Sequence, residues 1–503
     1  MLPTIVFEGR EYSPAWLQQN IARVQAGLTE LGCREGDTVA AMLRNSPQYV
    51  AVVLACRLGG FYLASVNWHF KTHEARHILV DSEARALFIH DDLVGQVQDG
   101  FPSDLAVVVV ASGRPVERPG KPAVSFEAFG DGSPPMPSRQ LINHGAITYT
   151  SGTTGVPKGV KRTAPPPELR NQMIEGMYRV TETVYGDGSD LVAYLSAPIY
   201  HSAPMTYVQH FARLGARIVL ERSFDPAHAL ALMARERVTH AYLVPTMYRR
   251  LLTLDEAERK RHDLSSLRHV ASTGSPCPPA VKRAMIAWLG PVINEAYGSS
   301  EASYTTFINS LEWLERPGSA GRQLPNATVR ILDADGSPLP PNTVGLIYVR
   351  QHSNTDFTYI NKPQARRDVE REGLVTLGDM GYFDEEGYLF ICDRQADMVI
   401  SGGVNIYPAE IEAVLQSMPG IADCAVFGIP DPEYGEALGA AVQTAEGFTL
   451  SASDVQSWIR DRMANFKVPR LVEFHEALPR EETGKIFKRK LKQPHWDGLG
   501  RSI

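Results

Sequence analysis

Cysteine is scarce in this sequence, with five residues spread over a chain of 503. No two cysteines stand in a C-x-x-C pair, so the sequence indicates neither a zinc site nor a framework of disulfides. Such usage is typical of a reducing compartment, and we therefore expect a cytoplasmic protein.

Long apolar runs and an excess of positive charge are also lacking. No apolar stretch is long enough to span a bilayer, so we expect no integral membrane segment. The first residues show no basic segment followed by an apolar run, so we expect no signal peptide. The net charge of -7 and the pI of about 6.1 give no electrostatic support for nucleic-acid binding. Nothing indicates the oligomeric state, and a homodimer remains open.

Helix and strand patterns alternate through the first part of the chain. Ser13 and Pro14 are typical of a helix start, and apolar residues then recur at helical spacing as far as Leu31. The stretch GDTVAAML predicts a buried strand, QYVAVVLACRLGG a helix and FYLASVN a further strand. This alternation indicates an α/β fold with helices layered on parallel strands.

Two later regions have different patterns. Between about 319 and 393, short strand patterns joined by Asp-Gly and Glu-Gly turns predict an antiparallel sheet. After Arg394, mixed helix and strand patterns predict a small α+β domain of roughly 100 residues. We therefore expect a large N-terminal domain over residues 1–393 and a small C-terminal domain over residues 394–503.

The stretch YTSGTTGVPKGVKR, from Tyr149 to Arg162, combines glycines, hydroxyl groups and a lysine after a strand pattern. Backbone N–H groups of a glycine-rich turn can point together at a phosphate, while hydroxyls and a lysine add hydrogen bonds and charge. The stretch matches neither the Walker pattern nor the dinucleotide pattern G-x-G-x-x-G. On these residues alone, a plain surface loop and a phosphate-binding loop both remain open.

This loop resembles the phosphate loop of the adenylate-forming superfamily, in the branch of acyl-CoA synthetases and AMP-dependent ligases. Five further stretches resemble motifs of that family and follow in the same order. They are ASTGSPCP at 271–278, NEAYGSSEAS at 294–303, GDMGYFDEEGYLFICDR at 378–394, DMVISGGVNIYPAEIE at 397–412 and LPREETGKIFKRKL at 478–491. The resemblance spans nearly the whole chain and implies an enzyme that uses ATP, Mg²⁺ and coenzyme A.

The resemblance implies a nucleotide site with distinct roles for a few side chains. Asp379 would accept hydrogen bonds from both ribose hydroxyls, with Arg394 as a second ribose or phosphate contact. Tyr297 would lie against the adenine. Glu301 would bind the magnesium ion, together with Thr150. The other residues expected to bind nucleotide or coenzyme A are Ser151, Gly152, Thr153, Thr154, Gly155, Lys158, Gly274, Ser275, Pro276, Glu295, Ala296, Gly298, Ser300, Gly402 and Gly403.

The C-terminal motifs imply a moving part. Lys485 would stabilise the negative charge that builds up when the substrate carboxylate attacks the α-phosphate. The small domain would then rotate about a hinge near 394–397, where Ala396 replaces the Asp or Lys that is common in the family. Gly402 and Gly403 would next form a wall of the pantetheine tunnel. Two departures, Ser300 and Leu377, stand where the family often has threonine, whereas the basic run at 488–490 is expected to be a solvated face.

The stretch APIYHSAPMTY at 197–207 resembles the acyl side of the family's pocket. His201 would lie near the activated carboxylate and act in catalysis with Lys485 and Glu301. The stretch 197–207 contains no aspartate that could hold a substrate ammonium group, which favours a carboxylic acid without an α-amino group. Fatty, aryl and polycyclic acids remain open, and so does an amine or a carrier protein in place of coenzyme A. The candidates for the acid pocket are His201, Ser202, Met205, Tyr207, Gly298 and Ser299.

Overall fold

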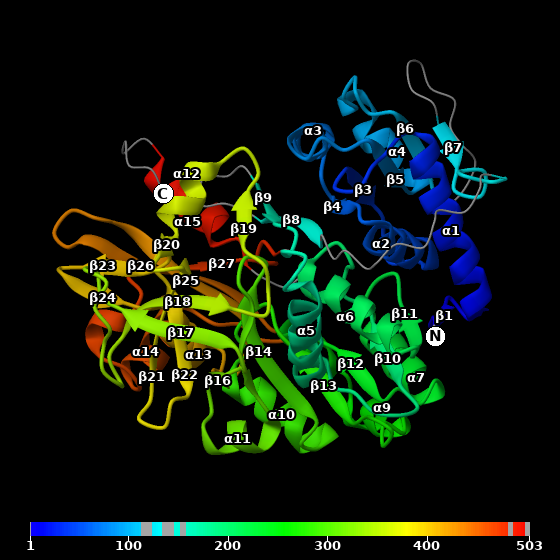
Figure 1. The fold of residues 1–503 in the computed structure, drawn as a ribbon. Coiled ribbons are helices and arrows are strands. Elements are labelled where there is room, and N and C mark those ends of the chain that lie inside the picture. Colours follow the sequence, from blue (N-terminus) through cyan, green and yellow to red (C-terminus); the bar gives the residue numbers. More distant parts are fainter. Residues whose placement is uncertain (1, 112–122, 133–144, 151–156, 481–485, 498–503) are drawn as a thin grey trace.

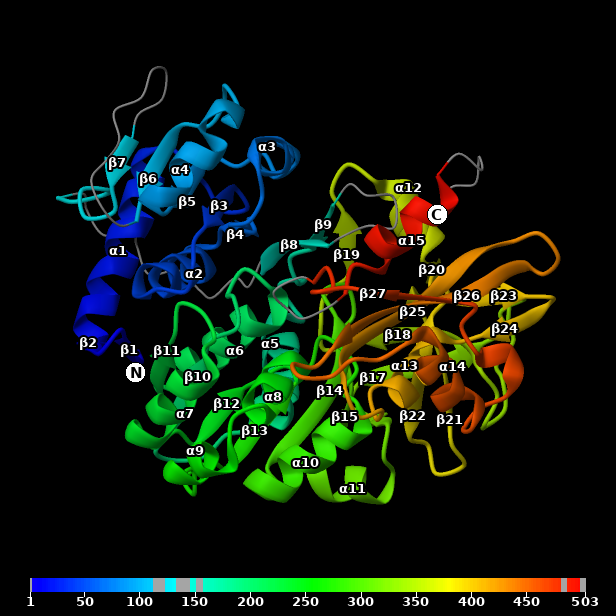
Figure 2. The ribbon, with the colours of Figure 1, turned by 180° about the vertical axis from the view of Figure 1, so that it is seen from behind.

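The computed structural model describes residues 2–111, 123–132, 145–150, 157–480 and 486–497. Figure 1 shows a large body, coloured blue to yellow, and a smaller C-terminal part, coloured orange to red, that packs beside the antiparallel strands. Figure 2 shows the same arrangement from behind. The expected fold of a large α/β body with an antiparallel sheet and a small α+β domain is confirmed.

The longest sheet runs through the centre of the described chain and changes from parallel to antiparallel pairing. Its parallel core has the order β14-β13-β12-β10-β11-β1, and β14 pairs with β15 in antiparallel fashion. The parallel side with its edge hairpin contains β1 (Thr4–Phe7), β2 (Arg10–Tyr12), β10 (Val192–Leu195), β11 (Arg217–Leu220), β12 (His240–Tyr242), β13 (His269–Ser272) and β14 (Ile293–Ser299). The antiparallel side contains β15 (Ser303–Ile308), β16 (Ser319–Gln323), β17 (Ala327–Leu332), β18 (Gly345–Gln351), β20 (Glu370–Arg371), β21 (Leu374–Phe383) and β22 (Leu389–Arg394).

A second sheet occupies the blue and cyan region of Figure 1. Its order is β19-β9-β8-β4-β3-β5-β6-β7, and its strands are parallel except at the β19–β9–β8 end. That end brings Phe357–Tyr359, far along the chain, beside the strand that follows the phosphate loop. The members are β3 (Thr38–Met42), β4 (Tyr62–Ser65), β5 (Ala86–Ile89), β6 (Val107–Val110), β7 (Ala123–Ser125), β8 (Ala146–Thr150), β9 (Lys158–Arg162) and β19 (Phe357–Tyr359).

Helices cover these sheets and begin where the sequence supplies caps. The Ser13 side chain accepts a hydrogen bond from the N–H of Trp16 at the start of α1, and Ser46 does the same for Tyr49 at the start of α2. The helices of this body are α1 (Pro14–Glu30), α2 (Pro47–Gly59), α3 (Thr72–Asp81), α4 (Asp91–Val97), α5 (Arg170–Tyr185), α6 (Ser202–Arg213), α7 (Pro226–Arg235), α8 (Pro245–Leu252), α9 (Glu256–Arg261), α10 (Pro279–Leu289), α11 (Ser310–Glu315) and α12 (Pro363–Asp368). No described helix has the length and apolarity needed to cross a membrane.

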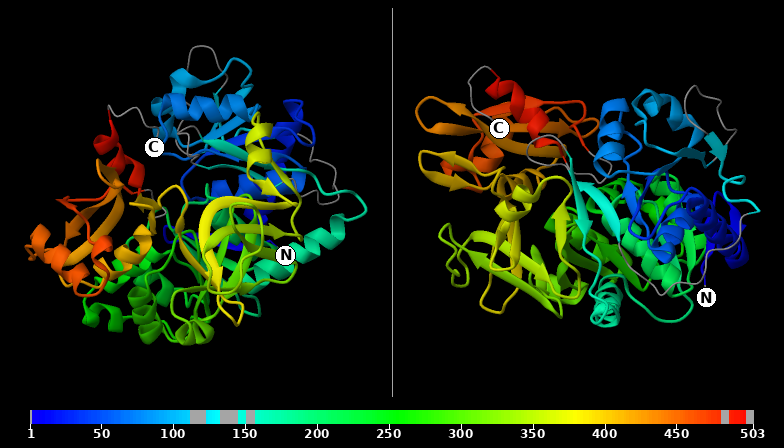
Figure 3. Two further views of the ribbon diagram at one scale, coloured as in Figure 1. Left: turned by 90° about the vertical axis from the view of Figure 1, so that its left-hand side faces the viewer. Right: turned by 45° about the horizontal axis from the view of Figure 1, so that its top comes forward.

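The C-terminal part has its own sheet and its own buried core (Figure 3). It contains β23 (Val399–Ser401), β24 (Val404–Ile406), β25 (Ile421–Asp431), β26 (Gly435–Thr444), β27 (Leu471–Phe474), α13 (Pro408–Leu415), α14 (Ala452–Arg460) and α15 (Lys488–Trp496). Several polar contacts between described residues join it to the large body, among them the following two. The N–H of Ala409 donates to Asp393 at 2.8 Å, and Arg249 of α8 pairs with Asp423 of β25 at 3.0 Å.

Candidate functional site

Several of the predicted site residues gather at the carboxyl ends of the parallel strands of the longest sheet. His201 and Ser202 follow β10, the loop with Gly274, Ser275 and Pro276 follows β13, and β14 ends at Ser299 just before Ser300 and Glu301. The carboxyl ends of parallel strands meet at one edge of a sheet, where open α/β folds bind their ligands. The order of elements therefore places these motifs together although they lie far apart in the sequence.

Two antiparallel strands flank the predicted phosphate loop. Thr150 at the end of β8 pairs with Lys158 at the start of β9. The intervening predicted residues Ser151, Gly152, Thr153, Thr154 and Gly155 lie outside the described residues. Lys158 directs its Nζ over the ring of Tyr359, 5.2 Å from the ring centre.

Glu301 is buried beside this lysine. Its Oε1 accepts a hydrogen bond from the Tyr359 hydroxyl at 3.0 Å. Burial raises the pKa of Tyr359, and the nearby Glu301 carboxylate raises it further. Thr150, Lys158, Tyr359 and Glu301 thus form a chain of neighbours that spans three elements. One carboxylate of this kind fits Mg²⁺, which in nucleotide sites takes one or two protein carboxylates and completes its shell with phosphate oxygens and water.

Arg162 fixes the backbone that carries Glu301. Its Nη2 donates to the carbonyl oxygens of Ser300 at 2.8 Å and of Glu301 at 2.9 Å, and its Nη1 donates to Thr355 at 2.9 Å. Burial lowers the pKa of Arg162 to about 10, against the opposing effect of the Glu301 charge, so the guanidinium stays protonated at neutral pH. The sequence gives no indication of this role, because Arg162 contacts residues that lie more than 130 positions away.

The predicted ribose side is a compact group of three side chains. Asp379 is buried, its Oδ2 accepts from the Tyr297 hydroxyl at 2.7 Å, and its Oδ1 pairs with Nε of Arg394 at 3.2 Å. Burial and the adjacent Asp379 carboxylate raise the pKa of Tyr297 well above its usual value, which keeps the phenol protonated as a donor. Strands β21 and β22 place Asp379 directly opposite Arg394.

Three predicted residues of β14 contact the elements around this strand. The Glu295 carboxylate pairs with the buried ammonium of Lys282 at 2.7 Å, so its side chain is committed to α10. Ala296 is buried in the main core. Gly298 lies against β15, where an added Cβ would approach the Ser303 carbonyl oxygen to 2.2 Å. These residues shape the strand that carries Tyr297 and leads to Glu301.

His201 directly precedes α6, and its neighbour Ser202 contacts the stretch that carries Glu301. The Ser202 and Ser300 hydroxyls are 3.0 Å apart, which connects the predicted acyl stretch to the magnesium stretch. Nε2 of His201 is buried and has no hydrogen-bond partner among the described residues. Burial lowers the pKa of His201 to about 4, so its ring is neutral at neutral pH and can exchange a hydrogen bond with an uncharged partner.

The buried histidines predict a loss of stability in mild acid. Burial lowers the pKa values of His90 and His210 to about 4 and of His240 to about 3, as it does for His201. The unfolded chain binds protons on these rings below about pH 6.5, whereas the folded chain does not until about pH 4. The free energy of unfolding, measured in urea, should therefore fall as the pH is lowered through this window. His210→Phe should flatten the dependence and the exposed control His73→Asn should not, and a stability independent of pH would contradict the expectation.

Met205 and Tyr207 lie on different faces of α6. Met205 lines a small cavity next to α2 and β8, whereas Tyr207 is fully buried in an aromatic cluster. The ring centres of Tyr185 and Tyr242 lie 5.2 and 5.7 Å from that of Tyr207. Two residues that are two positions apart on a helix point in nearly opposite directions, so they contact different surroundings.

Comparison with known proteins decides the family. A family model described as "AMP-binding enzyme" matches residues 2–356, and a model described as "AMP-binding enzyme C-terminal domain" matches residues 410–485. The chain belongs to the AMP-binding enzyme family. The adenylate-forming resemblance is thereby confirmed.

Individual relatives of this AMP-binding enzyme differ in their substrates. A feruloyl-CoA synthase of Amycolatopsis sp is 34% identical over 487 residues, covering 96% of this chain and 94% of the relative. A fatty acid–[acyl-carrier-protein] ligase of Streptomyces coeruleorubidus is 30% identical over 523 residues, covering 100% and 95%. The solved structure of an amide bond synthetase from Marinactinospora thermotolerans has a TM-score of 0.84 and 27% identity, covering 98% of this chain and 96% of that one.

The predicted site residues in the C-terminal part are Gly402, Gly403 and Lys485. Gly402 and Gly403 form the exposed turn between β23 and β24, both with positive φ, and α13 begins shortly afterwards at Pro408. Lys485 lies outside the described residues. The neighbouring Arg480 and Ile486 form an antiparallel bridge, so the two ends of its segment lie side by side.

The prediction that the run at 488–490 is a solvated face is wrong for Lys488. Its Nζ pairs with Glu412 of α13 at 2.9 Å, and only 16% of each side chain is exposed. Attraction to Glu412, Asp393 and Asp397 outweighs burial and raises the pKa of Lys488. Local sequence gives no signal of this pair, because its partners come from other elements of the small domain and from its junction with the large body.

Proposed function

We propose that this AMP-binding enzyme is an acyl-CoA synthetase that converts a carboxylic acid, ATP and coenzyme A into acyl-CoA, AMP and pyrophosphate. The observation that carries the proposal is the contact between Ser202 and Ser300, which brings the acyl stretch to the residue beside Glu301. The acid-side residues therefore adjoin the stretch that carries Glu301, and Asp379 on the ribose side contacts Tyr297 of the same stretch.

In the first step, the substrate carboxylate attacks the α-phosphate and pyrophosphate leaves. Thr150, Lys158 and the intervening turn would bind the β- and γ-phosphates, and Asp379 would hold the ribose. Bound Mg²⁺ would neutralise phosphate charge, with the Glu301 carboxylate as its protein ligand. Lys485 would offset the negative charge shared by the carboxylate and the α-phosphate. Neutral His201 would contribute a hydrogen bond near the acid.

In the second step, the thiol of coenzyme A attacks the acyl-adenylate and AMP leaves. We propose that the small domain rotates near residues 394–397 between the steps, with residues 1–393 and 394–503 as the two bodies. Rotation would withdraw Lys485 and bring the turn at Gly402 and Gly403 to the site. Glycines permit a thin ligand to pass close to the backbone. The exposure of that turn supports this proposal, since it is free to form a new contact.

The acid is proposed to lack an α-amino group. The absence of an aspartate in the stretch 197–207 supports this choice. Release of pyrophosphate from ATP with a panel of fatty, aryl and amino acids would test it. The purified protein should then be given coenzyme A, free amines and a carrier protein in parallel. Product with amine or carrier protein but none with coenzyme A would overturn the assigned acceptor.

Asp379→Asn should weaken ATP binding on the order of tenfold, because the amide keeps the shape but loses the charge that strengthens hydrogen bonds from the ribose. Isothermal titration with a non-hydrolysable ATP analogue would measure it. The exposed Asp335→Asn is the matched control and should bind as the natural protein does. An equal dissociation constant for both variants would remove Asp379 from the ribose site.

A further inference from the structure

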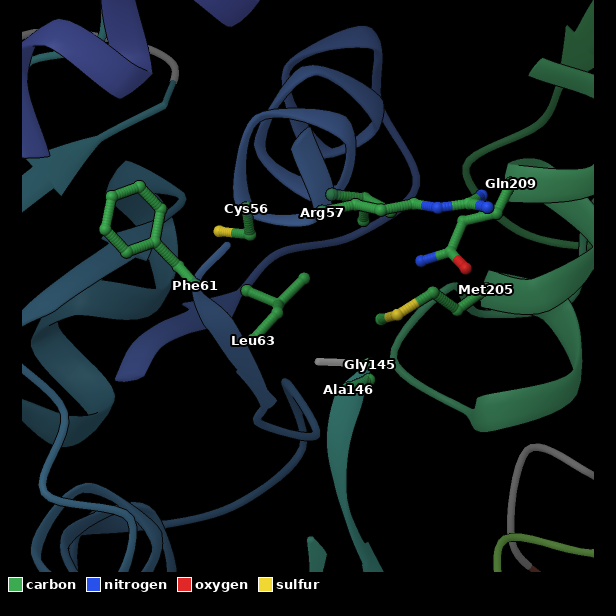
Figure 4. Close-up of a pocket in the computed structure, with 9 residues that line it drawn as sticks. Cys56, Arg57, Phe61, Leu63, Gly145, Ala146, Met205 and Gln209 are labelled. Atoms are coloured by element: carbon green, nitrogen blue, oxygen red, sulfur yellow. The ribbon is translucent and has the colours of Figure 1, made fainter. Parts of the chain in front are cut away.

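A small cavity lies between α2, β4, β8 and α6, about one turn of α6 beyond the site. It has room for about one water molecule. Figure 4 shows Arg57 extending from α2 toward Gln209 of α6, with the Gln209 amide directed back toward Met205. The lining residues are Val53, Cys56, Arg57, Phe61, Leu63, Gly145, Ala146, Met205 and Gln209.

Arg57 is a partly buried cation without a carboxylate partner among the described residues. Its Nη2 donates to the Tyr178 hydroxyl at 3.3 Å, and its Nε atom is buried and has no partner there. Burial lowers the pKa of Arg57, and the positive charge of Arg213 lowers it further. Arg213 lies over the Tyr178 ring and is instead paired with Glu182 at 2.8 Å. A buried N–H donor without a partner is costly unless a ligand completes it.

The geometry of α6 connects this cation to the proposed reaction centre. Ser202, Met205 and Gln209 are spaced by three and four residues, so they follow one face of the helix. At 1.5 Å per residue, the path from Ser202 to Gln209 is about 10 Å long. Ser202 contacts Ser300 at one end, and Gln209 borders the Arg57 cavity at the other.

We propose that Arg57 and Gln209, which line this cavity, bind the distal carboxylate of a dicarboxylic acid whose other carboxylate is activated next to Ser202. The cavity holds about one water molecule, so Met205 has to move to make room for the carboxylate. The inference rests on the proposed function and names its substrate class. The Arg57 guanidinium pairs with the distal carboxylate in two hydrogen bonds, and the Gln209 amide donates a third. Met205 stands between the two ends, and its unbranched, flexible side chain turns aside to admit the acyl chain.

The test compares straight-chain monocarboxylic and dicarboxylic acids of matched length by kcat/KM for pyrophosphate release. The natural protein should prefer the diacid on the order of 10- to 100-fold, as expected for a charge-assisted hydrogen-bonding pair. The preference should be largest when the carboxyl groups lie about 10 Å apart, the length of the α6 path. Arg57→Met should abolish or reverse the preference for the diacid, and Arg57→Lys should retain part of that preference. Arg213→Met, whose arginine is already paired, is the control and should retain the full preference.

The outcomes separate this inference from the proposed function. Activation of monoacids without preference for diacids would overturn the inference and leave the synthetase activity standing. An Arg57→Met variant that loses both acid series equally would show that Arg57 only supports the fold, and would also overturn it. If no acid of either series releases pyrophosphate, the proposed function fails and the inference fails with it.

Discussion

Lys485→Ala is expected to slow acyl-adenylate formation on the order of 10²- to 10³-fold and to leave thioester formation near its normal rate. The lysine would supply a preorganised positive charge only while the carboxylate attacks the α-phosphate. Thioester formation would instead use the turn at Gly402 and Gly403, after the small domain has moved. The two half-reactions should therefore respond differently to one substitution.

Two assays separate the half-reactions. Pyrophosphate release from ATP and acid reports the first, and acyl-CoA formation from synthetic acyl-adenylate reports the second. Lys490→Ala, an exposed lysine of the same run, is the matched control and should leave both rates unchanged. Equal loss of both rates in a folded Lys485→Ala variant would exclude a role confined to adenylation.

The fold was predictable because its signals are local. Ser13 and Ser46 lie directly before Pro-initiated helices, and both cap them as expected. Strands such as Thr38–Met42 are continuous apolar runs because helices cover both faces of a parallel sheet. The pairing of β19 with β9 could not be predicted, since the two strands are almost 200 residues apart and neither has a distinctive pattern.

The site was predictable only where a motif carries it. Asp379, Tyr297 and Arg394 stand in stretches that resemble family motifs, and the structure joins them in one hydrogen-bonded group. Tyr359 and Arg57 stand outside those stretches. Their contacts depend on which elements become neighbours in space, so residue type and spacing along the chain give no indication of them.

Lys488 shows the same limit in a different way. A run of basic residues is usually solvated, and its immediate neighbours support that interpretation. The lysine is nevertheless drawn into the small domain because Glu412 and Asp393 supply opposite charge. Tertiary electrostatics decide whether a charged side chain is buried, and a sequence pattern records only that the charge is present.

Replacing Asp423 is the second substitution for which we expect a large loss of adenylation rate, because Asp423 joins the small domain to the large body. Its Oδ1 accepts from Arg249 of α8 at 3.0 Å, and its Oδ2 accepts from Nε of Arg480 at 2.7 Å. The Asp423 carboxylate thus connects Arg249 of the large body to Arg480 of the small domain. Arg480 in turn forms an antiparallel bridge with Ile486, the first described residue after Lys485. We infer that this arrangement docks the small domain for adenylation, because the glycine turn at 402–403 is exposed in it.

Asp423→Asn should therefore slow adenylation on the order of 100-fold and spare thioester formation from synthetic acyl-adenylate. Removing one partner of a buried ion pair costs roughly 3–5 kcal/mol, and the expected loss is smaller here because about a quarter of each arginine side chain is exposed. The exposed control Asp461→Asn should change neither rate. Arg249→Met should reproduce the Asp423→Asn pattern from the other side of the interface, since it breaks the same contact without altering the small domain. If Asp423→Asn slows both half-reactions while Arg249→Met slows neither, Asp423 stabilises the small domain alone and does not hold it in place for the first step.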